Sequence, residues 1–158
     1  GRACFMAIVF AMSLLKYVPL NIDVVVVGST KEEFDSSGAN ARMWRDHPDY
    51  VIVLDTTGYV KPGAGVVIEH GPECDERMVQ RFSEIARAKK IPYTLHSEPE
   101  DSSTNTKYYQ ASACGSVTCL LSLPQKYCHS PVEIVKLSDI ENTGKLLASF
   151  VESFDGTL

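Results

Sequence analysis

Four residues of this chain carry side chains that bind metal ions or move protons: Glu32, Glu33, Asp55 and His129. Carboxylates and imidazole are ligands for zinc, manganese or cobalt. Adjacent side chains point in different directions, so one glutamate of the pair can bind a metal while the other takes a proton from a metal-bound water. The chemistry that these residue types indicate is hydrolysis by a metal-activated water.

Each of these residues also has a purely structural interpretation. Glu32 and Glu33 can be solvated glutamates in a loop. Asp55 can cap the loop that follows an apolar run, and His129 can be an ordinary loop histidine. The spacing alone leaves both interpretations open. The other histidines are weaker ligand candidates: His47, His70 and His96.

The elements that must position these side chains alternate between helices and apolar strands. The four valines at 24–27 predict a strand buried on both faces, and residues 50–54 predict a second strand that ends on Asp55. Further strands are expected at 66–69, 91–95, 117–123 and 132–135, and helices at 4–15, 37–45, 75–90, 107–113 and 138–154. Ser138 is expected to cap the last helix, with Glu141 completing a capping box.

This alternation predicts an α/β fold, a three-layer sandwich with a mainly parallel central sheet and helices on both faces. In such sheets, ligands bind beyond the carboxyl ends of the strands. Glu32 and Glu33 follow the first strand, Asp55 ends the second, and His129 follows the strand at 117–123. We therefore expect the four residues to converge at one edge of the sheet.

Length, charge and cysteines narrow the class of protein. The chain has 158 residues, which is the size of one domain. Its 15 basic and 20 acidic residues give a net charge of −5. The composition therefore does not indicate the basic surface with which proteins bind nucleic acids or anionic membranes. None of its five cysteines forms a Cys-x-x-Cys spacing, which argues against a zinc ribbon and fits reduced thiols in the cytoplasm. No Gly-x-Ser-x-Gly elbow or glycine-rich phosphate loop is present.

The first residues have two interpretations. Residues 4–15 are almost all apolar and follow Arg2, as in a short secretory signal, but the run is too short to cross a bilayer. We expect a buried helix, with a signal peptide as the alternative. Because no capping residue precedes this helix, we also expect an N-terminal portion to be missing.

Several motifs together resemble one known family, the dinuclear-metal glutamyl and tetrahedral aminopeptidases, some of which carry cellulase-like names. The motifs are Lys31-Glu32-Glu33-Phe34, Gly38-Ala39, Pro48-Asp49-Tyr50-Val51-Ile52-Val53-Leu54-Asp55, Ser122-Leu123-Pro124, Tyr127, His129-Ser130-Pro131-Val132-Glu133 and Asp139-Ile140-Glu141-Asn142-Thr143. The resemblance covers nearly the whole chain. It implies a zinc-peptidase-like fold and removal of N-terminal residues from peptides.

The resemblance also implies roles for the four residues. Glu32 matches the general base that activates the bridging water, and Glu33 matches a metal ligand. Asp55 matches a ligand of the other metal, and His129 matches the last ligand. Two zinc or cobalt ions are the cofactors that the family would use.

The departures from the family pattern indicate an impaired site. Phe5 stands where the family has the aspartate that bridges both metals, and Ser103-Thr104-Asn105 replaces a Gly-Thr-Asp stretch. We expect residues 1–158 to form one domain, the C-terminal portion of the catalytic domain. The N-terminal portion, with another histidine ligand and an inserted dimerisation domain, is expected to be absent.

Two functions follow from this resemblance. The first is an aminopeptidase-like domain, impaired or inactive, with peptides as its partners. The alternative is a non-catalytic homologue that acts as a binding or assembly module. A truncated surface would be apolar, so self-association or a partner chain that covers it is expected in either case. No nucleic-acid or membrane partner is expected.

Overall fold

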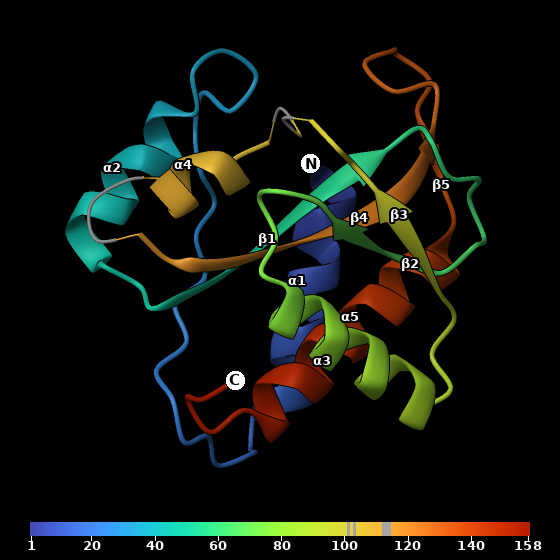
Figure 1. Cartoon of the computed structure of the whole chain (residues 1–158). Helices are drawn as coiled ribbons and strands as arrows, with labels where there is room; N and C mark the ends of the chain where they lie inside the picture. Colours follow the sequence, from blue (N-terminus) through green and yellow to red (C-terminus); the bar gives the residue numbers. More distant parts are fainter. Residues whose placement is uncertain (101, 103, 112–114) are drawn as a thin grey trace.

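The structure is a computed structural model that describes residues 1–100, 102, 104–111 and 115–158. Its helices and strands are interspersed along the chain (Figure 1). In chain order they are α1 (Arg2–Leu15), α2 (Ser37–Asp46), β1 (Tyr50–Thr57), β2 (Val66–His70), α3 (Glu76–Ala88), β3 (Tyr93–Ser97), α4 (Thr106–Ala111), β4 (Val117–Lys126), β5 (Ile134–Val135) and α5 (Leu137–Ser153).

The strands form a sheet with the order β1-β4-β2-β3, and the short β5 pairs with the end of β4. The β1–β4 and β2–β3 pairs are parallel, whereas β4 runs antiparallel to β2 and β5. The sheet is therefore mixed, and β4 lies between two strands that precede it in the chain. The α/β fold with a central sheet and flanking helices is confirmed.

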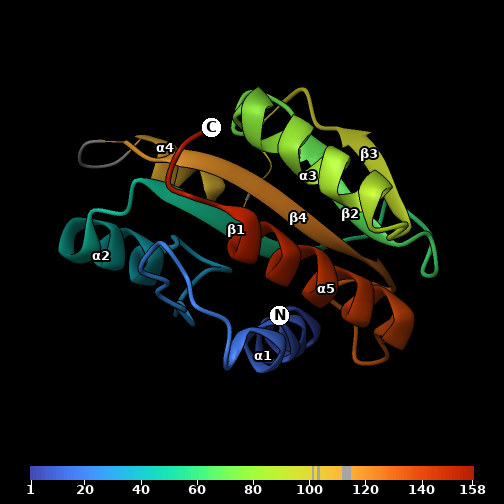
Figure 2. The same ribbon diagram turned by 90° about the horizontal axis from the view of Figure 1, so that it is seen from below.

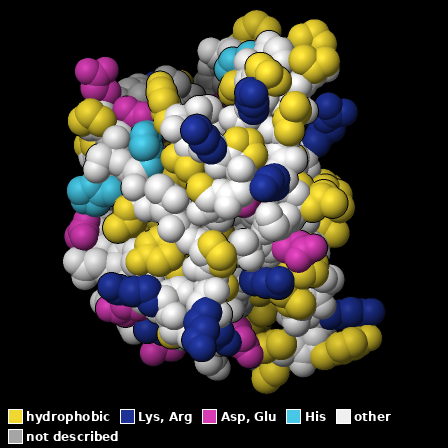
Figure 3. All heavy atoms as spheres, turned by 90° about the vertical axis from the view of Figure 1, so that its right-hand side faces the viewer, with side chains coloured by type: hydrophobic (Ala, Val, Ile, Leu, Met, Phe, Trp, Pro, Cys, Tyr) yellow, Lys and Arg dark blue, Asp and Glu magenta, His cyan; other side chains and the backbone are white. Residues whose placement is uncertain are grey.

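Helices cover both faces of this sheet. Successive side chains of β4 point to opposite faces, so β4 contributes to a core on each side. Cys119 and Leu121 pack into the larger core, which α1, α3 and α5 close on one face (Figure 2). Leu120 packs on the other face with Met43 of α2 and Tyr109 of α4. On the side seen in Figure 3, acidic and basic side chains are interspersed, so this side presents no field of a single sign.

The strand predicted at 24–27 is wrong, since these residues form no strand in the structure. Val24, Val25 and Val26 are 40%, 60% and 47% exposed. A β-branched run forms a strand only where a neighbour offers ladder hydrogen bonds and packing. The segment instead runs beside a hollow of about 940 Å³ that it lines together with β1 residues 50–54.

Smaller differences concern the ends of elements. β1 and β4 continue to Thr57 and Lys126, beyond the predicted ends, because they stay paired up to Thr57 and Pro124. Lys136, not Ser138, is the N-cap of α5 and makes no side-chain capping bond. Residues 112 and 113 of the helix predicted at 107–113 lie outside the described residues.

A buried carboxylate fixes the loop after β1. Asp139 of α5 is fully buried and accepts the backbone N–H of Gly63 at 2.6 Å and of Gly65 at 3.2 Å. Gly65 has φ +89°, and a Cβ there would lie 2.1 Å from the Pro92 carbonyl oxygen, so only glycine fits. This contact explains why an acidic residue belongs to the C-terminal motif.

The helix predicted at 4–15 is confirmed as α1, which packs its small side chains against α5 (Figure 2). None of the described helices is long and apolar enough to cross a membrane.

Candidate functional site

A tight turn presents Glu32 and Glu33. The carbonyl oxygen of Lys31 accepts the backbone N–H groups of residues 34, 35 and 36 at 3.3, 3.2 and 2.9 Å. α2 then starts close to the same turn: a Cβ on Gly38 would lie 2.5 Å from the backbone nitrogen and oxygen of Thr30. The Gly38-Ala39 motif therefore positions the glutamate turn, since no larger residue fits at 38.

Asp55 lies near the end of β1, opposite Ser122 of β4. Its Oδ1 accepts the backbone N–H of Thr56 at 2.7 Å. Burial raises the pKa of the Asp55 carboxyl, and the nearby charge of Glu33 raises it further, while the Thr56 N–H and His129 lower it. Asp55 is thus the most enclosed of the four predicted residues and shares its surroundings with Glu33 and His129.

His129 lies in the loop after β4, with a left-handed backbone at φ +57°. Its backbone N–H donates to Oε1 of Glu133 at 3.0 Å, which holds the loop. Its Nε2 lies 3.4 Å from Oε2 of Glu33, and these side chains are 75% and 69% exposed. Glu33 and His129 therefore form a pair that is exposed to solvent.

Glu32 is half-buried behind this pair. Burial raises the pKa of its carboxyl, the charges of Asp55 and Glu33 raise it further, and His129 lowers it. The four residues are thus near enough to act on one another's ionisation. A carboxylate with a raised pKa is a stronger proton acceptor, which is the property required of a general base.

The residues present do not fit a dinuclear metal centre. Among the residues that the structure describes, no three His, Cys, Asp or Glu side chains are grouped so that they could hold a metal ion. Phe5 is 55% exposed in the first turns of α1. Its neighbour Cys4 has a pKa raised to about 12, by burial and then by the charge of Asp55, so this end of α1 lies near Asp55. The phenyl ring of Phe5 offers no ligand atom to a metal ion at this end of α1.

Two weaker histidine candidates are paired elsewhere. Nδ1 of His96 lies 2.7 Å from Oε2 of Glu69, which is 5% exposed, and the ring of Tyr59 stacks on His96. Nε2 of His70 lies 2.9 Å from Glu76. The Glu69–His96 pair was not predicted, because it depends on the register of β2 and β3, which sets these two residues opposite each other.

Of the stretch Ser103-Thr104-Asn105, the structure describes Thr104 and Asn105. Ser103 lies outside the described residues. The side-chain amide of Asn105 donates to Oγ of Ser29 at 3.1 Å. Asn105 therefore connects the start of α4 to the segment that leads into the glutamate turn.

Several known proteins are similar to this chain. Lysyl aminopeptidase of Pyrococcus furiosus is 30% identical over 140 residues, which are 82% of this chain and 40% of that protein. A TET aminopeptidase from a marine-sediment Thaumarchaeota archaeon superposes with a TM-score of 0.89 at 20% identity, over 99% of this chain and 48% of that one. The TET1 peptidase of Pyrococcus horikoshii, which can assemble into a tetrahedron or a large octahedral shell, gives 0.67 at 26% identity, over 80% and 40%.

The chain spans less than half the length of each of these three relatives. The family described as M42 glutamyl aminopeptidase matches residues 1–146, which is most of the chain. The likeness of motifs, sheet and sequence thus has one explanation: the chain belongs to the M42 glutamyl aminopeptidase family.

Proposed function

We propose that this chain is an aminopeptidase-type domain that contributes part of a peptide-hydrolysing site and is impaired or inactive by itself. One observation carries the proposal: residues that could serve as base and ligands gather at one sheet edge, but the described residues include no group of three metal donors. A catalytic metal site needs about three protein ligands and an open position. The donors among the described residues are not grouped closely enough to meet that requirement.

In this proposal Glu32 accepts the proton of the attacking water, and its raised pKa supports the role. Glu33, Asp55 and His129 are the residues that would contribute to binding zinc or cobalt. Residues 1–158 would then be one domain, the C-terminal portion of a longer catalytic domain. The length of the relatives supports this division.

The test combines metal content with turnover. The purified chain is dialysed against zinc or cobalt, and elemental analysis gives the metal bound per chain, alongside an assay with aminoacyl p-nitroanilides. We expect less than one metal per chain and no turnover above that of Glu32→Gln. Turnover that is lost in Glu32→Gln, with about two metals bound, would contradict the proposed impairment.

Phe5→Asp isolates the missing donor, and Phe5→Asn is its matched control, since it is polar but uncharged. We expect Phe5→Asp to bind more metal than the parent chain and Phe5→Asn to bind no more. Circular dichroism checks that both variants fold. Equal metal binding by the two variants would show that the carboxylate at this position is not what the site lacks.

The alternative function, a binding or assembly module, is favoured by the hollow beside β1. β1 pairs with β4 along one edge, and no described residue pairs with its other edge. The hollow on that side is lined by the exposed valines, by Leu147 and Phe150 of α5, and by polar residues that include Arg42 and Asp49. An open strand edge next to apolar surface accepts an added strand, so we propose that a second copy of the chain covers it.

Sedimentation velocity tests this alternative. Val25→Lys places a charge in the hollow, whereas Val132→Lys places one on an equally exposed valine of the loop before β5; the two valines are 60% and 67% exposed. We expect the parent chain and Val132→Lys to associate and Val25→Lys to remain monomeric. A parent chain that is monomeric well above micromolar concentration would contradict self-association.

A further inference from the structure

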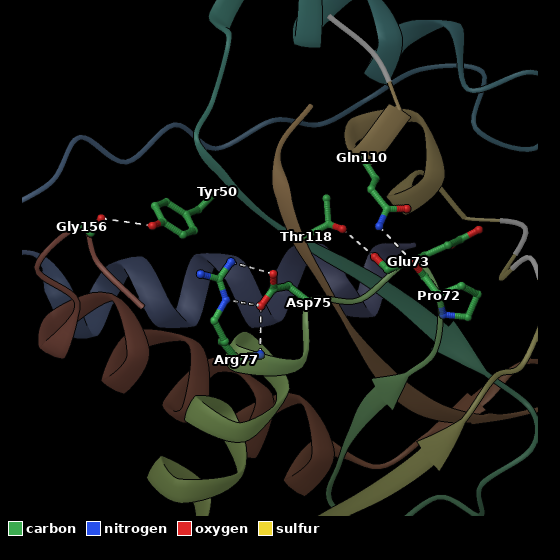
Figure 4. A network of polar contacts seen from close by, with 8 residues as sticks. All are labelled: Tyr50, Pro72, Glu73, Asp75, Arg77, Gln110, Thr118 and Gly156. Carbon is green, nitrogen blue, oxygen red and sulfur yellow. Dashed lines mark hydrogen bonds and ion pairs between the residues drawn. The ribbon is translucent and has the colours of Figure 1, made fainter. Parts of the chain in front are cut away.

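The short segment between β2 and α3 is attached to the centre of the sheet (Figure 4). Oγ1 of Thr118 in β4 donates to the Glu73 carbonyl at 2.5 Å, and the Asp75 backbone N–H donates to the Thr118 carbonyl at 2.8 Å. The side-chain amide of Gln110 in α4 donates to the Pro72 carbonyl at 3.0 Å. These bonds lie on both sides of Cys74 and fix its position against β4.

Cys74 therefore lies against Cys119, the residue that follows Thr118. Cys74 packs against the core cluster that contains Cys119, the two thiols act on each other's ionisation, and both are free. The hydrogen bond from Cys119 lowers the pKa of Cys74, with help from the Leu120 backbone, and the same bond together with burial raises the pKa of Cys119. Cys119 therefore holds its proton more strongly, and Cys74 is the more nucleophilic sulfur.

The accessibility of the two thiols points to the same residue. Cys74 is half-buried, whereas Cys119 is 0% exposed, so a reagent from solvent meets Cys74 first. Cys74 directly precedes Asp75, the N-cap of the 13-residue helix α3. The positive end of a helix favours a thiolate nearby, whereas the charges of Glu69 and Glu73 raise the pKa of Cys74 and so oppose it. Neither the proposed hydrolytic site nor the hollow uses these two cysteines.

We propose that Cys74 and Cys119 are a redox-active dithiol that a hydroperoxide converts into an intramolecular disulfide. The Cys74 thiolate attacks the peroxide, the O–O bond breaks, and the leaving alkoxide or hydroxide takes up a proton, which leaves a sulfenic acid on Cys74. The Cys119 sulfur then attacks the Cys74 sulfur, the S–O bond breaks, and water leaves with the thiol proton. Two thiols lose two electrons, and the peroxide gains them.

The disulfide would join the start of α3 to the central strand and so close a long loop of the chain. Such a bond restricts the unfolded chain and raises resistance to unfolding. We therefore expect oxidation to shift the urea midpoint upward, and a reductant to reverse the shift. The shift of the urea midpoint requires no hydrolytic activity, so its result does not depend on the function proposed above.

The test treats the purified chain with hydrogen peroxide and maps the cysteines by mass spectrometry without reduction. We expect the loss of two hydrogen atoms from the intact mass and a linked pair of peptides that contain Cys74 and Cys119. Exposed Cys128 serves as the internal comparison, since it reports exposure alone. If Cys74 and Cys119 remain open to alkylation while Cys128 is oxidised, the proposal is wrong.

Two variants test whether the reaction depends on the pairing of Cys74 with Cys119 or only on the exposure of a thiol. Cys119→Ser should stop the reaction at a Cys74 sulfenic acid that dimedone traps, and Cys128→Ser should form the disulfide at the parent rate. Should Cys119→Ser fail to fold, Cys74→Ser at the half-buried position gives a second test, because Cys119 should then resist peroxide. Rapid oxidation of Cys119 in Cys74→Ser would overturn the assigned order.

Discussion

The part of the molecule around β4 and the part around β1 and residues 22–36 differ in how completely they are packed. Eight of the ten residues of β4 are buried, and the neighbouring β2 residues Val66, Val67 and Ile68 have no exposed surface. On the other side of β1, a hollow of about 940 Å³ separates it from valines that are up to 60% exposed. Packing is complete around β4 and β2 and incomplete between β1 and the valine segment, although the side chains of both parts are largely apolar.

The largest effect should come from the packed part. Asp139→Ala removes the only described carboxylate that accepts the Gly63 and Gly65 N–H groups, and we expect a loss of roughly 3 kcal/mol or more from the free energy of unfolding. Urea denaturation of the parent chain and the variant measures this loss. Asp139→Asn, which keeps one acceptor oxygen, should lose less. A loss below about 1 kcal/mol in the alanine variant would show that the loop is held by other contacts.

A matched pair of substitutions compares the two parts directly. Val67→Thr buries a hydroxyl in β2 and should cost about 1–3 kcal/mol, whereas Val25→Thr changes a solvent-exposed residue and should stay within about 0.5 kcal/mol. Both keep the same shape, so only the environment differs. Equal losses in urea denaturation of the monomer would mean that residues 24–27 are as well packed as β2.

An intermediate effect is expected at the start of α3, where Asp75 is the N-cap. Its carboxylate accepts the backbone N–H and the side chain of Arg77 at 2.8–3.0 Å, and these bonds hold its pKa below the ordinary value. Asp75→Ala should cost about 1 kcal/mol near neutral pH.

The same residue predicts a pH dependence. Because the folded pKa is lowered, the carboxylate stabilises the fold above its unfolded pKa of about 3.9, and this contribution disappears as the pH falls through the folded value. The difference in urea midpoint between the parent chain and Asp75→Ala should therefore shrink in acid. Asp75→Asn retains the capping acceptor but loses the charge, so a control as stable as the parent chain at every pH would remove the charge from the explanation.

The smallest effect should be found at the candidate site. Glu33 and His129 lie 3.4 Å apart but are mostly exposed, so a double-mutant cycle should give a coupling of no more than about 0.5 kcal/mol. A coupling near that of a buried pair would indicate that the site closes more tightly than the distance suggests. Because Glu33 and His129 alone should not hold a zinc ion, saturating zinc should leave their coupling free energy unchanged.

The sequence predicted the packed part better than the open part, for a physical reason. Strand 117–123 and the helix at 75–90 carry periodic apolar residues whose partners all lie within the chain, so pattern and structure agree for β4 and α3. The valines at 24–27 have an equally strong β-pattern, but no described residue of the chain pairs with them. An apolar pattern indicates the secondary structure that a segment prefers. Whether a strand forms depends on the neighbouring strands and side chains that can pair with it.

The candidate site shows the same limit. The motifs pointed to Glu32, Glu33, Asp55 and His129, and the pKa shifts connect all four. The spacing could not give the distances among them, because these depend on loops with left-handed residues such as Lys31 and His129. Nor could it give the Glu69–His96 pair, which follows from strand register. The roles of the four residues stay predictions.

The strand order has a consequence for the order of events when the chain is made. β4 is the last long strand in the chain, yet it separates β1 from the β2–β3 pair. Until residues 117–126 have left the ribosome, the β2–α3–β3 unit can form by local contacts while β1 has no partner strand among the described residues. Insertion of β4 must then close a loop of more than a third of the chain length, from Tyr50 to its partner Val117, before the two parts of the sheet become one. Folding should therefore wait for the C-terminal third, and a stalled nascent chain should expose β1 to proteases.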